Sequence, residues 1–137
     1  MIEITRLQQH KVFTHQEAEE LLPLIYRMTE SSNKEIKYIK QCMDALPPAN
    51  KSKWFELELK MDQEIDRWNK KIERLGLKPK GVWLADFDNG EGFFCWKFPE
   101  TQILYKHGYQ DGFSGRILVQ SEKIKKDYEH ESSPNSN

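Results

Sequence analysis

The side chains best suited to chemistry gather in one part of the chain, between residues 86 and 116. They are one thiol, one imidazole, one guanidinium and three carboxylates: Asp86, Cys95, Glu100, His107, Asp111 and Arg116. Cysteine, histidine and carboxylate side chains are the usual protein ligands of zinc and other transition metals. The sequence therefore predicts a metal site of Cys95, Glu100 and His107. It also predicts a site for a small molecule or anion formed by Asp86, Glu100, His107 and Arg116.

The spacing of these residues matches no standard metal motif. The chain has no CxxC pair, no HExxH segment and no closely paired histidines. Each residue also has a simpler structural alternative: Cys95 as a small buried side chain in an aromatic run, Asp86 as a partner of backbone donors or of Arg116, and Glu100 as part of a turn. The identities of the metal and of the ligand therefore stay open.

Nucleophilic catalysis is disfavoured by the surroundings of the thiol. A Cys95–His107 dyad needs a thiolate stabilised in an exposed, electropositive environment. The neighbours of Cys95 in sequence are instead aromatic: Phe93, Phe94, Trp96 and Phe98. The sequence predicts no catalytic residue and favours a binding protein over an enzyme.

Residues 107–116 form a glycine-rich loop. Gly108, Gly112 and Gly115 have GxxxGxxG spacing after a predicted strand, but no helix follows, so the segment is not a dinucleotide-binding motif. A phosphate cradle with Arg116 as the anion partner is one interpretation. A loop that needs special backbone angles is the one we favour.

Composition limits the class of protein. The chain has 137 residues and a net charge of −1, and residues 76–119 carry five basic against five acidic side chains, which argues against nucleic-acid binding. No apolar run approaches the roughly 20 residues of a membrane span, and no signal peptide begins the chain. Two cysteines are too few for a disulfide scaffold. We therefore expect a cytoplasmic protein without a membrane or nucleic-acid partner.

The first half of the chain predicts two long helices, over about residues 15–46 and 51–75. The first begins with a capping box, Thr14 with Glu17, and ends at Pro47-Pro48. We expect Pro23 to kink this helix without breaking it, because the apolar stripe keeps its phase on both sides. The second helix has a near-heptad stripe and ends at Gly76. The short link between them predicts an antiparallel hairpin.

Glycine and aromatic residues then dominate, which indicates strands joined by tight turns. We predict three strands over residues 82–87, 93–98 and 102–106, with a hairpin turn at Asn89-Gly90. The β region, residues 80–107, would form a meander packed on the hairpin. The fold class is therefore α+β, with one domain over residues 1–119. Residues 120–137 would be a charged, partly disordered tail with a loose helix at 121–131.

The length of the helices predicts an oligomer. The first helix would span roughly 45 Å, whereas a six-residue strand covers about 20 Å. The uncovered part would expose a set of apolar side chains unless the seam of the hairpin suffices: Ile36, Ile39, Met43, Trp54, Leu57 and Met61. Two hairpins paired as a four-helix bundle would bury them, so we predict a homodimer. The alternative to a binding site is therefore a non-catalytic module for homo-oligomerisation or protein–protein interaction.

Several short motifs together resemble a known family. They are Phe13-Thr14-x-x-Glu17-Ala18-x-x-Leu21-Leu22-Pro23, Ile72-Glu73-x-Leu75-Gly76, Cys95-Trp96 followed by Glu100, His107, and Gly112-Phe113-x-Gly115-Arg116. In order and spacing they are similar to the prokaryotic domain-of-unknown-function 2203 family, over about residues 12–118. The resemblance implies the fold but no activity. It implies functional positions at Asp86, Cys95, Glu100, His107 and Arg116.

Overall fold

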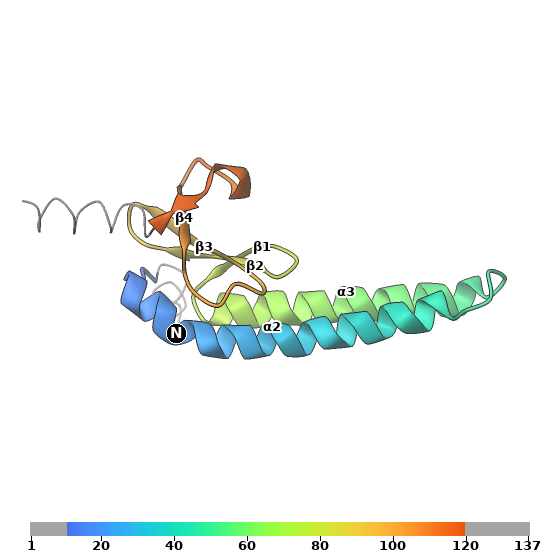
Figure 1. Ribbon diagram of the computed structural model, residues 1–137. Helices are drawn as coiled ribbons and strands as arrows, with labels where there is room; N and C mark the ends of the chain where they lie inside the picture. The colour runs from blue at the N-terminus through green and yellow to red at the C-terminus, as the bar shows by residue number, and fades with distance from the viewer. Residues whose placement is uncertain (1–10, 120–137) are drawn as a thin grey trace, which may run out of the picture.

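The computed structural model describes residues 11–119, in which two long helices are followed by a five-stranded sheet and a short 3-10 turn (Figure 1). The predicted helix at 121–131 and the predicted tail lie outside the described residues. Among the described residues, no helix is both long enough and apolar enough to cross a membrane.

Helix α2, His15–Asp44, begins where the capping box predicted. The Thr14 hydroxyl accepts a hydrogen bond from the Glu17 backbone N–H, and the Glu17 carboxylate accepts one from the Thr14 N–H, so two otherwise unpaired donors are satisfied. Pro23 lies inside the helix and does not end it. The expected kink at this proline stays a prediction.

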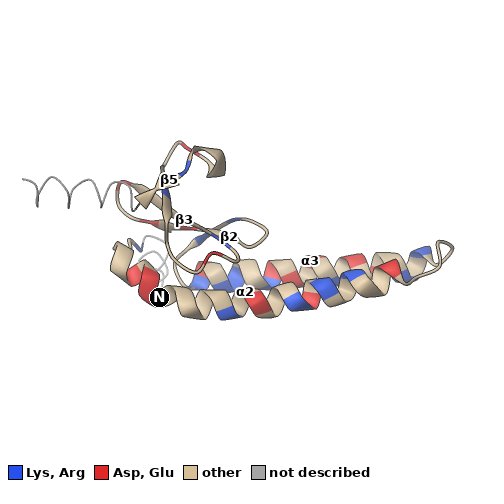
Figure 2. Cartoon of the chain, viewed as in Figure 1, with Lys and Arg blue, Asp and Glu red and all other residues tan. Residues whose placement is uncertain are grey.

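Helix α3, Lys51–Arg74, lies antiparallel to α2 and completes the predicted hairpin. The Asn50 side chain caps its first turn, and Gly76 follows its end with a φ of 93°, a conformation that favours glycine. Charged residues of both signs occur along the length of both helices (Figure 2). Two polar contacts cross the seam between the helices: the Trp68 indole N–H donates to the buried Thr29 hydroxyl at 2.9 Å, and the Ser32 hydroxyl donates to Glu64 Oε2 at 2.7 Å.

The sheet has five antiparallel strands rather than the three predicted. In spatial order they are β1 Lys78–Gly81, β2 Leu84–Asp88, β3 Gly92–Lys97, β4 Tyr105–Gly108 and β5 Ile117–Leu118. The prediction missed β1 because its sequence, KPKG, has no apolar alternation, and it missed β5 because that strand has only two residues. Both strands add to the sheet through backbone hydrogen bonds to a neighbour.

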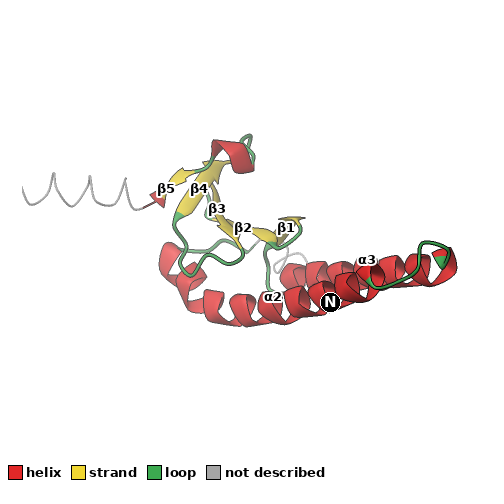
Figure 3. Cartoon of the chain, turned by 45° about the vertical axis from the view of Figure 1, so that its right-hand side comes forward, coloured by secondary structure: helices red, strands yellow, loops and turns green. Residues whose placement is uncertain are grey.

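The two faces of the sheet have different surroundings. Ala85, Phe87, Phe94 and Trp96 belong to the main apolar core together with the hairpin. Figure 3 shows the sheet over one end of the hairpin, with the other end of both helices projecting beyond it. The face turned away from the helices carries the alternate residues of β2, β3 and β4, and the loop after β4 folds over it.

Candidate metal centre

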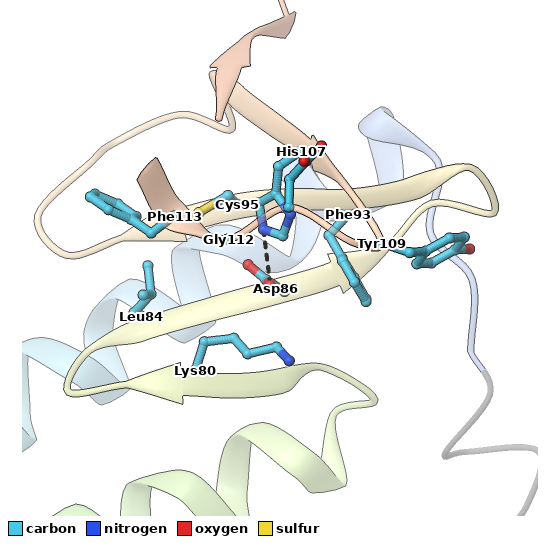
Figure 4. A pocket seen from close by; sticks show the side chains of 10 residues that line it. Lys80, Leu84, Asp86, Phe93, Cys95, His107, Tyr109, Gly112 and Phe113 are labelled. Carbon is cyan, nitrogen blue, oxygen red and sulfur yellow. Dashed lines mark hydrogen bonds and ion pairs between the residues drawn. The ribbon is translucent and has the colours of Figure 1, made fainter. Parts of the chain in front are cut away.

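Strand pairing brings three of the predicted site residues together. Asp86 on β2 lies directly opposite Cys95 on β3, and His107 on β4 lies opposite Phe93, two residues before Cys95. Side chains two positions apart on a strand point to the same face. Asp86, Cys95 and His107 therefore share the face turned away from the helices. In Figure 4 the carboxylate and the imidazole point toward one another across β3.

These three side chains form a tight, buried cluster. One donor atom from each lies within 4.8 Å of the other two. His107 Nε2 is 3.0 Å from Asp86 Oδ2, and both side chains are only 3% exposed. Cys95 is also buried, at 1% exposure. One carboxylate, one thiol and one imidazole thus meet with almost no access to solvent.

The hydrogen bonds of His107 fix where its protons lie. Its Nδ1 is 2.9 Å from the carbonyl oxygen of Gly108, and a carbonyl only accepts, so Nδ1 carries a proton. The contact of Nε2 with the Asp86 carboxyl then requires one further proton, held by the imidazole or by the carboxyl group. A proton therefore lies between these two groups.

Burial disfavours the deprotonated forms of the Asp86 carboxyl and the Cys95 thiol. Burial raises the pKa of Asp86, although His107 and Lys80 act in the opposite direction. Burial also raises the pKa of the Cys95 thiol to about 12, and Asp86 adds to this effect while Arg116 opposes it. The thiol is therefore protonated at neutral pH and is a poor nucleophile. The second oxygen of Asp86, Oδ1, is buried and has no hydrogen-bond partner among the described residues.

The cluster forms one wall of a cavity of about 210 Å³. Strand residues and the loop after β4 line it: Lys80, Leu84, Asp86, Phe93, Cys95, His107, Tyr109, Asp111, Gly112 and Phe113. Sequence reasoning missed Lys80 because it missed β1, and it missed Tyr109, whose hydroxyl donates to Asp88 Oδ1 at 2.7 Å. No local pattern signals either residue, because strand pairing and loop folding place them there.

The structure places Glu100 and Arg116 beside the cluster and not within it. Arg116 Nη1 lies 2.9 Å from Glu100 Oε2, an ion pair that lacks the direction of a hydrogen bond. The guanidinium carbon is 3.9 Å from the centre of the Tyr105 ring and 4.2 Å from that of Phe113. The other oxygen of Glu100 accepts a hydrogen bond from the Lys97 N–H, which holds the turn after β3. Arg116 acts on the cluster through its charge, which opposes the rise in the pKa of the Cys95 thiol.

The glycine-rich loop does not depend on special backbone angles, so that expectation is wrong. Among the described residues, the only glycines with positive φ are Gly76 and Gly90, and both lie outside this loop. Two of the loop glycines lie so close to Asp111 that a larger residue at either position would crowd its side chain. A Cβ on Gly108 would lie 2.9 Å from Asp111 Oδ2, and a Cβ on Gly115 would lie 3.2 Å from Asp111 Cβ. Asp111 itself accepts a hydrogen bond from the Gly108 N–H and so holds the loop.

Fold and site together define an α+β protein in which a long helical hairpin supports one face of an antiparallel sheet. The other face holds the buried Asp86–Cys95–His107 cluster. The chain belongs to the DUF2203 family of uncharacterized conserved proteins, whose model matches residues 11–119, as the short motifs predicted. No curated protein and no solved structure is significantly similar to the chain.

Proposed function

We propose that Asp86, Cys95 and His107 bind a divalent transition metal ion, and that zinc suits these donors best. The observation that supports this most is the cluster itself, in which three different metal-binding groups lie buried within 4.8 Å of one another. A mixed set of thiolate, imidazole and carboxylate donors is typical of zinc and disfavours magnesium or calcium, which prefer oxygen ligands alone.

The distances in the cluster are compatible with one ion. Bonds of about 2.0–2.3 Å to zinc place the ligand atoms of a tetrahedral site roughly 3.3–3.8 Å apart. The Nε2–Oδ2 separation of 3.0 Å would open slightly, and the longest separation, 4.8 Å at most, would shorten by about 1 Å. The bond from His107 Nδ1 to the Gly108 carbonyl is the kind of support that orients histidine ligands in metal proteins.

Three protein donors leave one position of a tetrahedral ion open. Zinc sites of this kind hold a water or a small molecule in the fourth position, whereas purely structural zinc sites are closed by four protein ligands. The cavity beside the cluster would give such a ligand room. The function that follows is the binding of a small molecule at a metal ion. In this proposal the carboxylate ligand is Asp86 and not Glu100, which the sequence analysis predicted.

The first experiment is elemental analysis of the protein purified without chelator, followed by titration with cobalt(II). Cobalt reports its own ligands, because a bound thiolate adds a charge-transfer band in the near ultraviolet. We expect one metal per chain in the wild type, and loss of high affinity in His107→Ala, Asp86→Asn and Cys95→Ser.

Two control variants make this test specific. Cys42→Ser removes the other cysteine, which lies on α2 away from the cluster, and Glu100→Gln removes the carboxylate that pairs with Arg116. Both controls should bind cobalt as the wild type does, and the charge-transfer band should persist in Cys42→Ser. A wild-type protein that binds neither zinc nor cobalt would overturn the proposal.

A second candidate function is assembly through the helical hairpin, as the sequence also predicted. The contact between the two helices of one chain already buries part of the apolar stripe, since Ile36, Ile39 and Leu57 are only 4–7% exposed. Other large side chains on the projecting part are exposed: Tyr38, Trp54, Phe55 and Leu59. Light scattering after size exclusion tests this function. A dimer that dissociates in Phe55→Ser with Leu59→Ser supports it, and a wild type that stays monomeric at all concentrations contradicts it.

A further inference from the structure

Two lysines lie close to Phe93 in the wall of the cavity, and one of them, Lys80, also lines the cavity. Lys78 and Lys80 both belong to β1, and their ammonium groups lie 5.2 and 5.7 Å from the centre of the Phe93 ring, which lines the cavity. Figure 4 shows Lys80 on the strand next to Asp86. Within the part of the chain that the structure describes, no carboxylate forms an ion pair with either lysine. Two ammonium groups over one ring favour the approach of an anion.

The acidic groups nearby are already engaged. Asp86 bonds to His107, Asp88 accepts from the Tyr109 hydroxyl and the Gly90 N–H, and Asp111 accepts from the Gly108 N–H. A divalent ion bound to the Asp86 carboxylate and the Cys95 thiolate would have its charge balanced by these two ligands. The lysines would then have no ion-pair partner among the described residues, and the Asp111 carboxylate, which also lines the cavity, would offset part of their charge.

The lining and the volume of the cavity indicate the polarity and the size of a ligand that would bind there. Leu84, Phe93 and Phe113 give it an apolar lining. Its volume of about 210 Å³ is the space of roughly seven waters at about 30 Å³ each. This is enough for a compact organic acid and too little for a nucleotide, since pockets for drug-sized ligands begin at about 300 Å³.

We infer that the open position of the proposed metal ion accepts a small organic carboxylate, whose charge Lys78 and Lys80 attract and whose short apolar part lies against Leu84 and Phe113. This inference rests on the proposed metal site. It adds the chemical class of the ligand and two residues that select it.

The experiment uses the full chain loaded with cobalt(II) and titrated with butyrate, acetate and inorganic phosphate. A carboxylate that enters the metal's coordination changes the visible spectrum of the ion. We expect saturable changes with butyrate, weaker binding of acetate because it lacks the apolar part, and little response to phosphate. Tighter binding of phosphate than of butyrate would overturn the carboxylate assignment.

Charge variants separate selection by the lysines from general binding at the metal. Lys78→Gln and Lys80→Gln should each weaken butyrate binding roughly three- to fivefold, the effect of one partly exposed charge, when each variant is compared with the wild type at cobalt saturation. Asp111→Asn keeps the acceptor for Gly108 but removes a negative charge, so it should strengthen butyrate binding. Lys60→Gln, on the distant part of α3, should have no effect.

The outcomes distinguish the two proposals. If cobalt binds but its spectrum stays unchanged at high butyrate concentration, the carboxylate inference is wrong and the metal site stands. If butyrate binds equally well to wild type and to both lysine variants, the assigned role of the lysines is wrong. If cobalt does not bind, both proposals fall together.

Discussion

The pH dependence of metal binding gives a quantitative test of the cluster. The Cys95 thiol, with a pKa of about 12, stays protonated from pH 6 to pH 8, so a metal that binds its thiolate must release that proton. Each proton released makes the apparent affinity rise about tenfold per pH unit, or about 1.4 kcal/mol. Across these two pH units the thiol alone should account for an increase of about a hundredfold, in the direction of tighter binding at higher pH.

The proton between Asp86 and His107 adds to this dependence. A metal ion that takes the place of that proton releases it as well. The slope of log metal affinity against pH should therefore correspond to between one and two protons released per metal ion. The raised pKa of the thiol also weakens binding at neutral pH.

The assay is competition with a chromophoric chelator of known pH dependence, at pH 6, 7 and 8. It is run on wild type, Cys95→Ser and Cys42→Ser. The slope of log affinity against pH should fall by about one in Cys95→Ser, because the serine hydroxyl keeps its proton between pH 6 and pH 8, and should be unchanged in Cys42→Ser. Equal slopes in wild type and Cys95→Ser would refute the assignment of Cys95 as a ligand.

Two further predictions concern the packing that supports the site. Gly92→Ala should destabilise the protein by about 1–3 kcal/mol in urea unfolding and weaken cobalt binding, because its Cβ would lie 2.4 Å from the carbonyl oxygen of His107. Gly112→Ala is the matched control, because no atom lies within 4 Å of its Cβ. This variant should change the stability in urea and the cobalt affinity only slightly. Trp68→Phe should cost about 2 kcal/mol in urea unfolding, because the Thr29 hydroxyl loses its donor. Cobalt binding should be unaffected in Trp68→Phe, and a large loss would contradict the separation of hairpin and site.

Local signals in the sequence were enough to predict the helices. The capping box of Thr14 and Glu17, the apolar periodicity and the glycine at 76 each act within a few residues of the helix they define. The predicted range of 15–46 therefore differs from His15–Asp44 by two residues at one end only. The family resemblance over the same motifs was confirmed for the same reason, since it depends on order and spacing along the chain.

Strands at the edges of the sheet could not be predicted in this way. β1 and β5 contain little apolar alternation, and each forms because its backbone pairs with β2 or β4. The exposed side chains of the hairpin were also only partly foreseen. Ile36 and Leu57 are buried by the partner helix, whereas Phe55 and Leu59 lie off the apolar stripe and are exposed.

The members of the site were predictable as residue types but not as a set. Pairing of Asp86 with Cys95 depends on the register of β2 and β3, and the position of His107 depends on a further strand. Glu100 lies only five residues after Cys95, yet the turn after β3 directs its carboxylate to the Lys97 N–H and to Arg116. Distance along the chain is therefore a poor guide to which side chains meet on a sheet.

The energetics of the cluster support a binding role over a structural one. A carboxyl oxygen buried without a partner, as Asp86 Oδ1 is, costs about 1–3 kcal/mol relative to a satisfied group. Most residues of β2 and β3 are buried, so apolar residues at positions 86, 95 and 107 would make a more stable sheet. A ligand that binds only the folded protein recovers such a cost, and does so in proportion to its affinity. Added zinc should therefore raise the unfolding temperature of the wild type, and it should leave that of Asp86→Asn unchanged.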